Sequence, residues 1–501
     1  MGIVPISLGT QSNPGRYPAA GNCRHINCEA IPAGGEAKSP DPLWSSAGFR
    51  DYTTLQGDGG VRALFVVDNV LLAVAGRSVS RVVAGGTSTV VGGLATTGPV
   101  YIDRNRRSPN PQVAIVSDGL YSVYEGGVLT AVSDPALPSP QDVSFIDGYF
   151  LFTESRGRIT RSELDSAAVF DGLAYSNAET NPDKLVRGVR HETTYTAFGE
   201  RSIEHFVADA SVDPFAFSRS AATDIGCASA GSVVAVQQTI IWIADDKTVR
   251  RLNGYAGIKI SHEPVDRFIE SIADLTQVRA FTFTMKGMTY YILTAPEGTW
   301  SYNLTLNRWI ERTSYGLNRW RISCAVEFDG KIICGDYASP KLYEMRADVF
   351  TEAGQPLIME AWSPPVHGFP YYTLTNAVFI DAISGVGLAE TRNPIVTTAT
   401  STPTGLLMAI LSTTNTTSGG DISNAWLSDP ALILDYSDDD GINFKPPREL
   451  RLGKAGQTQT RLKALRFGRS KSQGRTYRLR ASAATVRGFI SMSADITKLQ
   501  P

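Results

Sequence analysis

The chain has 501 residues and a net charge of −2, and this length predicts roughly two to four domains. Hydrophobic residues make up 42% of the chain and charged residues 19%, which excludes a disordered chain and indicates a protein with a core. No apolar run approaches the roughly 20 residues of a membrane helix, so no membrane insertion by this chain is expected.

Residues 1–50 contain six prolines and several glycines. Proline fixes φ and removes a backbone donor, so this spacing leaves no room for a long helix or strand. We expect an extended N-terminal arm that lies on another part of the assembly. Its Cys23, His25 and Cys28 lie close together, but a zinc site would need a second pair of ligands at the right spacing. We therefore expect buried thiols and no metal or other cofactor.

Residues 51–350 repeat one pattern, which is clearest in Val233–Gly254. There the run VVAV ends at Gln237–Gln238, TIIWIA ends at Asp245–Lys247, and TVRRL ends at Asn253–Gly254. Turn residues fall where the period-2 runs stop, which predicts three antiparallel strands. A single meander of this kind cannot bury its own faces, so it must pack against neighbouring copies of the pattern.

Six further pairs of apolar runs flank tight turns at intervals of roughly 30 to 50 residues, which is the blade period of a propeller. Most of these turns carry residues that tolerate positive φ, as two-residue hairpins require. The turns lie at Asp68–Asn69, Asp118–Gly119, Asp147–Gly148, His191–Glu192, Lys286–Gly287 and Asp329–Gly330. The predicted fold is all-β, with a six- or seven-bladed β-propeller at residues 51–350. Two stacked sandwiches are the alternative.

One amphipathic helix is predicted at Val265–Leu275, because its apolar residues recur at helical spacing. We expect it at a blade edge or between subunits.

After residue 350 the period breaks, and residues 351–501 predict a separate C-terminal domain that resembles a β-sandwich. Strands are expected at residues 376–383, 431–436, 461–467, 477–483 and 488–492. A Thr/Ser-rich insertion at residues 396–420 separates the first two of them. We interpret it as a hairpin tip packed in an assembly, or as a loop that touches a partner or lines a channel. Its apolar centre contains Leu406, Leu407, Met408, Ile410 and Leu411.

The segment Ser437–Phe444 reads S-x-D-x-G-x-x-F. It resembles the Asp-box of sialidase-type propellers, in which the motif stabilises a hairpin turn and is not catalytic. Asp438, Asp439 and Asp440 could also bind Ca²⁺, but the twelve-residue loop that ends in Glu is absent. We expect a hairpin turn capped by a carboxylate.

Other candidate catalytic groups have simpler explanations. Asp118, Asp147 and Asp329 each lie in a tight turn, where turn propensity explains them without a glycosidase pair. The five histidines show neither ligand nor triad spacing. We therefore expect no enzyme, with a glycan-binding propeller or a glycosidase as the alternative.

Charge is segregated near the C-terminal end, where residues 451–487 contain eleven Lys or Arg residues and no acid. This segment predicts contact with an acidic surface of a neighbouring subunit or with nucleic acid. A solvated face of a sheet is the alternative. The candidate contact residues are Arg461, Lys463, Arg466, Arg469, Lys471, Arg475, Arg478 and Arg480.

Several motifs, in a fixed order, resemble the packaged-DNA stabilisation proteins of short-tailed phages, which are also called tail accessory or nozzle proteins. The motifs are IEHF at Ile203–Phe206, IIWIADDKTVRRLNGYAGIKIS at Ile240–Ser261, DRFIESI at Asp266–Ile272, ICGDYASPKLYEM at Ile333–Met345, YSDDDGINF at Tyr436–Phe444 and TYRLRASAATVRGFI at Thr476–Ile490. Each motif is weakly specific alone, and the shared order carries the resemblance.

The resemblance implies a virion tail protein without catalytic residues, assembled in the host cytoplasm. It implies a homohexamer below the portal and its adaptor ring. Such a ring extends the DNA channel, helps to retain the genome, and presents surfaces for a tail fibre or spike and for a tail needle or plug. Packaged double-stranded DNA would pass through it. Because the chain is slightly acidic, we expect a mostly non-adhesive conduit. The insertion at 396–420 departs from the family pattern.

Overall fold

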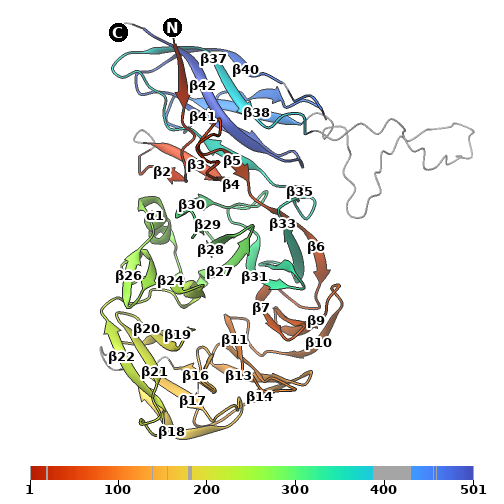
Figure 1. Ribbon diagram of the computed structural model, residues 1–501, viewed down its shortest axis with the longest axis vertical. Coiled ribbons are helices and arrows are strands. Elements are labelled where there is room, and N and C mark those ends of the chain that lie inside the picture. The colour runs from red at the N-terminus through yellow and green to blue at the C-terminus, as the bar shows by residue number, and fades with distance from the viewer. Residues whose placement is uncertain are drawn as a thin grey trace, which may run out of the picture. The chain divides into compact units, whose positions relative to one another are not determined.

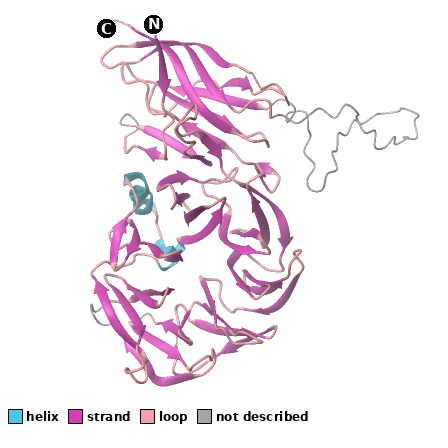
Figure 2. Ribbon diagram, in the orientation of Figure 1, coloured by secondary structure: helices cyan, strands magenta, loops and turns pink. Residues whose placement is uncertain are grey.

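The computed structural model describes residues 2–17, 21–137, 139–154, 156–178, 183–386, 430–454, 456–458 and 460–499 (Figure 1). These residues form an almost entirely β structure (Figure 2). They divide into two compact units. The propeller unit contains residues 51–307 and 317–345, and the sandwich unit contains residues 1–50, 308–316 and 346–501.

The described part of the propeller unit contains seven antiparallel blades with their strands in chain order. The first four are β7 (Val61–Val67), β8 (Val70–Ala75), β9 (Ser78–Val82) and β10 (Ser88–Gly93); β11 (Val100–Arg104), β12 (Val113–Ser117), β13 (Leu120–Glu125) and β14 (Val128–Val132); β15 (Ser144–Ile146), β16 (Tyr149–Thr153), β17 (Arg158–Ser162) and β18 (Phe170–Asn177); and β19 (Leu185–His191), β20 (Thr194–Gly199), β21 (Ile203–Ala208) and β22 (Phe217–Thr223). The others are β23 (Val234–Val236), β24 (Thr239–Ile243), β25 (Val249–Asn253) and β26 (Ala256–Lys259); β27 (Arg279–Met285), β28 (Met288–Ala295) and β29 (Gly298–Asn303); and β31 (Ile322–Phe328), β32 (Lys331–Asp336) and β33 (Lys341–Arg346).

The blades form a closed ring, because the first strand of each blade contacts the first strand of the next and β31 contacts β7 again. Strand β6 (Gly48–Thr54) lies beside β33 and completes the seventh blade with a strand from the other end of the sequence. The Leu55 N–H, just after β6, donates to the Pro340 carbonyl at 2.7 Å. This arrangement confirms the predicted propeller and sets its blade number at seven among the described residues.

The predicted hairpin turns lie where the sequence places them, and each contains a residue with positive φ. The first turn residue has φ of 51° at Asp68, 49° at Asp147 and 53° at Asp329. In six blades the turn joins the first and second strands. In the second blade the turn at Asp118 joins the second and third strands, because a longer loop at residues 105–112 follows β11.

Arginine side chains join neighbouring blades without ion pairs. In the first blade, Arg62 donates to the carbonyls of Thr96 at 3.0 Å and Gly98 at 2.6 Å, which lie at the entry to the second blade. In the fourth blade, Arg187 donates to the carbonyls of Ala230 and Val233 at the entry to the fifth. These bonds satisfy backbone groups that leave the strands, so they fix each connection against the previous blade.

Helix α1 (Glu263–Ser271) follows the fifth blade and has Pro264 in its first turn, where proline is tolerated. Val265 and Ile269 are fully buried, as the predicted apolar face requires. Leu275, at the end of the predicted helix, instead lies in a short 3-10 turn (Leu275–Gln277).

The sandwich unit contains two sheets. The first has the order β4 (Cys28–Ala30), β5 (Leu43–Ser45), β42 (Gly488–Lys498), β37 (Thr373–Ala382) and β40 (Leu462–Ser470), with β1 (Gly2–Ile6) on β42. The second has β30 (Arg308–Glu311), β3 (Asn22–Ile26), β36 (Met359–Trp362), β41 (Thr476–Ala481), β38 (Ala431–Ser437) and β39 (Arg448–Arg451), with β2 (Asn13–Pro14) on β3; β34 (Thr351–Glu352) and β35 (Gln355–Pro356) form a short hairpin. Val378 and Ala494 of the first sheet share one core with Leu432 and Leu479 of the second, which confirms a sandwich.

The structure of residues 1–50 differs from the predicted separate arm. Strand β1 pairs with β42 along its whole length, beside the N-terminus in Figure 1. Strand β3 pairs with β36. Leu43 and Ala30 are fully buried in the sandwich core. Backbone groups in a core need partners, and the short strands β3, β4 and β5 contain no proline, while β1 accommodates Pro5. The N-terminal segment is therefore part of the sandwich of its own chain.

Among the described residues, no helix has both the length and the apolar character needed to cross a bilayer.

Candidate functional site

The eight predicted contact residues lie on and beside two strands, β40 and β41, which belong to different sheets of the sandwich unit. Strand β40 is the last strand of its sheet among the described residues, and its buried and exposed positions alternate around a bulge. Strand β41 lies between β36 and β38, and its side chains are buried or half-buried. The two halves of the predicted site therefore lie in different environments.

Three of the predicted residues are held by carboxylates of β38 and the turn after it. Arg475 makes a two-point ion pair with Asp438, with Nε–Oδ1 at 2.7 Å and Nη2–Oδ2 at 3.2 Å. Arg478 and Arg480 both contact Asp435, at Nη2–Oδ2 distances of 2.6 and 2.8 Å. The Asp435 side chain is 2% exposed. These three cations stabilise the packing of β38 against β41. Because their charges are compensated within the chain, they are poor candidates for contact with a partner.

The other five predicted residues are exposed. We call them the basic stripe: Arg461, Lys463, Arg466, Arg469 and Lys471. No carboxylate of the described residues lies within ion-pair distance of any of them. The Lys463 ammonium lies 5.1 Å from the centre of the Phe379 ring, and the Arg469 guanidinium lies 4.0 Å from that of Tyr372. Cation–π attraction therefore holds two of the five charges over aromatic faces.

The basic stripe is electrostatically uncompensated. Its five like charges lie within residues 461–471, and solvent and salt screen their mutual repulsion only in part. Leu465 lies in the middle of the stripe, and half of its surface is exposed. A partner that combines negative charge with apolar surface would complement both features.

Arg469 and Lys471 also line a depression of about 290 Å³ in the same unit. The other lining residues are Asp438, Asp439, Asn443 and Lys445. Positive and negative groups both face this space, and Asp438 is already paired with Arg475. The depression is therefore a mixed polar surface rather than a site for one kind of ion.

The Asp-box-like segment forms a capped turn. The Asp439 carboxylate accepts from the Ser437 hydroxyl at 2.5 Å and from the Asn443 N–H at 2.8 Å. The Ser437 oxygen in turn accepts from the Gly441 N–H at 2.9 Å. These hydrogen bonds, the one from Ser437 foremost, lower the pKa of Asp439 to about 2. The geometry is that of a turn held by its own carboxylate.

The Cys23, His25 and Cys28 cluster is buried in the sandwich unit. His25 Nε2 lies 2.6 Å from the Leu8 carbonyl, which fixes it as the protonated nitrogen, and 3.9 Å from Cys23 Sγ. Burial raises the pKa of the Cys23 thiol to about 12 and also raises that of Cys28. Metal binding requires thiolate, so burial works against a zinc site here. Among the described residues no group of three or more His, Cys, Asp or Glu could hold a metal ion.

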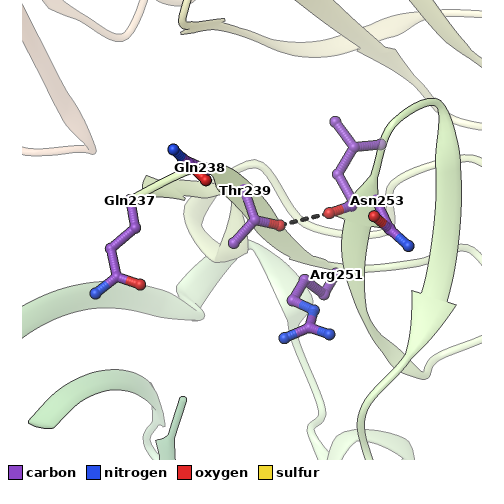
Figure 3. Close-up of a pocket in the computed structure, with 6 residues that line it drawn as sticks. Gln237, Gln238, Thr239, Arg251 and Asn253 are labelled. Atoms are coloured by element: carbon purple, nitrogen blue, oxygen red, sulfur yellow. Dashed lines mark hydrogen bonds between the residues drawn. The ribbon is translucent and has the colours of Figure 1, made fainter. Parts of the chain in front are cut away.

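A polar depression of about 480 Å³ lies at the hairpin turn of the fifth blade (Figure 3). Thr239 Oγ1 donates to the Leu252 carbonyl at 2.6 Å, and Gln237 Nε2 donates to Thr289 Oγ1 at 2.9 Å. Figure 3 shows the Arg251 guanidinium beside Thr239 and Asn253. The lining is made by turn residues that stabilise the blade, and no predicted site residue belongs to it.

The sequence interpretation missed an acidic segment at the outer strand of the third blade. Residues 163–177 contain three acids and no Lys or Arg. This excess of acidic over basic residues, together with apolar residues in turn-like positions, is visible in the sequence and could have identified the segment. The predicted apolar loop residues, by contrast, lie outside the described part of the chain: Leu406, Leu407, Met408, Ile410 and Leu411.

The closed seven-bladed ring defines a β-propeller protein, and its sandwich unit also carries an exposed basic stripe. A family model described as bacteriophage P22 Gp10, beta-propeller, matches residues 27–350. The chain belongs to this family of packaged-DNA stabilisation proteins, which are structural tail components of short-tailed phages. A search of curated proteins found no match.

Solved propeller structures are similar to the chain only at low identity. They include the WD40 β-propeller domain of Doa1 (12% identity, TM-score 0.39, 60% of this chain and 97% of that one) and BamB from Moraxella catarrhalis (11%, 0.37, 69% and 96%). A third is virginiamycin B lyase from Staphylococcus aureus (11%, 0.42, 59% and 98%).

Proposed function

We propose that the chain is a tail nozzle protein that forms a homohexameric ring below the portal and its adaptor ring. The ring extends the DNA channel, helps to retain the packaged genome, and presents surfaces for a tail fibre or spike and for a tail needle or plug. Membership of the packaged-DNA stabilisation family is the observation that carries this proposal. No step of it requires catalysis by this chain.

Two physical features support a role in the wall of a conduit. A closed propeller is a rigid block with short, protected edges, which suits repeated packing around an axis. The net charge of −2 limits adhesion to DNA, because tight DNA binding comes from neutralising phosphates and releasing their counterions. DNA can then move past the ring during ejection.

Assembly onto the purified portal–adaptor complex of the same phage tests the proposal. The full chain should bind that complex as a ring visible by electron microscopy, and particles that lack it should lose packaged DNA. A chain that stays monomeric beside the complex, and instead binds or hydrolyses glycans, would contradict the proposal and favour a lectin or glycosidase.

We propose further that the insertion at residues 396–420 lies toward the channel of the ring. Its apolar centre could narrow the channel after packaging. Deletion of residues 396–420 should leave ring assembly intact and increase the rate of DNA loss from filled particles. Unchanged DNA retention, with the loop on the outside of the ring, would overturn this role.

A further inference from the structure

The outer edge of the third blade carries an acidic and apolar surface. We call it the acidic edge: Glu163, Leu164, Asp165, Val169, Asp171 and Leu173. Strand β18 is the last strand of its four-stranded sheet, so this edge has no neighbouring strand among the described residues. None of its three carboxylates lies within ion-pair distance of a cation of the described chain. Like the basic stripe, it is a set of uncompensated charges.

A β-bulge in β18 exposes the Leu173 side chain of the acidic edge. Thr160 of β17 pairs with Tyr175, but Ser162 pairs with Phe170, so four residues of β18, 171–174, lie opposite the single residue Arg161. The Asp171 carboxylate accepts from the Leu173 N–H at 3.0 Å and holds the bulge in shape. Leu173 is 73% exposed as a result. Bulges of this kind re-aim a side chain, and an exposed leucine on an edge strand marks a contact surface.

We propose that the basic stripe of one copy docks on the acidic edge of the third blade of a second copy. This inference rests on the proposed ring and names a surface pair for its subunit contacts. Five unpaired cations face three unpaired carboxylates, and Leu465 within the stripe finds an apolar partner in Leu173. The two surfaces are different patches of one chain, so the contact is heterologous, as ring closure requires.

DNA is a poorer partner for the basic stripe. Phosphate contacts use cations and gain nothing from Leu465, whose exposed surface a phosphate backbone would leave in water. The docking also does not add a strand to β40. The carbonyls of Leu465 and Arg466, at the centre of the stripe, already accept from the Arg448 guanidinium, so the docking is assigned to side chains.

Cysteine trapping tests the pair in the full-length protein. An equimolar mixture of the single variants Leu173→Cys and Leu465→Cys, under mild oxidation at low salt, should form a disulfide-linked dimer. A control mixture of Ile258→Cys and Leu465→Cys should not, because Ile258 is also exposed (42%) but lies on the outer strand of another blade. A dimer yield no higher than that of the control mixture would overturn the proposal. So would a chain with both Leu173→Cys and Leu465→Cys that forms its crosslink only within one monomer.

Charge reversal gives the second readout. Lys463→Glu with Arg469→Glu in the Leu465→Cys chain should lower the trapped yield about tenfold, and Glu163→Lys with Asp165→Lys in the Leu173→Cys chain should restore it, because both leave the Asp171 bond to Leu173 intact. Equal yields would contradict the electrostatic pairing. If the reversed stripe instead loses affinity for a DNA duplex while trapping is unchanged, the stripe binds nucleic acid.

Ring assembly on the portal–adaptor complex separates this inference from the proposed function. If unaltered protein assembles there and the reversed stripe assembles equally well, the ring exists but uses other surfaces. If even the unaltered protein fails to assemble, the proposed function itself is wrong.

Discussion

Asp435 is a buried carboxylate that compensates two guanidinium groups of the neighbouring strand, those of Arg478 and Arg480. Removing one member of such a group leaves uncompensated charge in a place with little access to water. The Asp435 contact is therefore a structural requirement of the second sandwich sheet, although its arginines fall in the most basic stretch of the sequence.

We expect Asp435→Ala to lower the free energy of unfolding by about 3–5 kcal/mol, because two half-buried cations lose their partner. Glu449→Ala is the matched control, since the Glu449–Arg451 pair is exposed on both sides, and it should cost about 1 kcal/mol or less. Urea denaturation of both variants measures the difference. Equal losses would show that Asp435 is not a buried anchor.

His25 gives the sandwich unit a pH-dependent stability. Burial lowers its pKa to about 4, and its Nδ1 has no hydrogen-bond partner in the described structure. Above about pH 6.5 the imidazole is neutral in both states, so its full contribution is present. As the pH falls toward 4, the unfolded state binds a proton that the folded state does not, and stability declines.

The expected loss from this one group is about 3 kcal/mol between pH 6.5 and pH 4. A His25→Gln variant can still donate to the Leu8 carbonyl but cannot titrate there. The difference in unfolding free energy between the two proteins should therefore shrink or reverse in favour of the variant as the pH falls. A constant difference across this range would contradict the assignment.

At the scale of the element, the hairpin turn is what the sequence specifies best. Asp147–Gly148 and Asp329–Gly330 are local signals for positive φ, and the structure places them in tight turns. The strands that follow from them were predictable because their pairing is also local. The second blade shows the limit: its first strand is joined by a longer loop, so the turn at Asp118 marks a different pair of strands.

The turn at Lys286 offers a direct test, because its φ of 51° is costly for most residues. Lys286→Asn should raise stability by about 0.5–1 kcal/mol, and Lys286→Val should lower it by about 1–2 kcal/mol. Ala131→Val on strand β14 is the control, since Ala131 is exposed and a β-branched residue suits a strand. Equal stability of the two Lys286 variants would contradict the turn geometry.

The candidate site was predictable only in part, because the sequence shows local charge but not which distant strands pair. The charge imbalance of residues 451–487 is visible in the sequence, and it correctly identifies the exposed cations of β40. The ion pairs of Arg475 and Arg478 were not predictable, because their carboxylates lie about 40 residues earlier, on β38 and in the turn after it, and the sequence does not show how β38 and β41 pair. A basic stretch thus combines surface and structural charges.

At the scale of the whole molecule, the least predictable feature is the use of residues 1–50. Their strands have short and irregular sequences, and their partners β36 and β42 lie more than 300 residues later. Such pairings leave no local pattern. The chain also passes between its two units at residues 50, 307, 316 and 345, so neither unit is one continuous segment.

We therefore expect residues 346–501 alone not to fold cooperatively. The fragment lacks β3 and β5, and it lacks the buried side chains of Leu43 and Ala30 in the shared core. Burying such side chains contributes a large share of the stability of a small sandwich. Circular dichroism during thermal unfolding should show no sharp transition for the fragment and a sharp one for the full chain. A cooperative fragment would contradict the shared core.

The pairing of β1 with β42 also determines when, during synthesis of the chain, the first sandwich sheet can be completed. Gly2 lies opposite Ile496, so β1 leaves the ribosome long before its partner β42 and cannot pair until β42 follows. At about 5–20 residues per second, that interval is roughly half a minute or longer. A chain released early by a stalled ribosome would lack the finished sandwich. Completion of the sandwich unit therefore waits for the synthesis of β42.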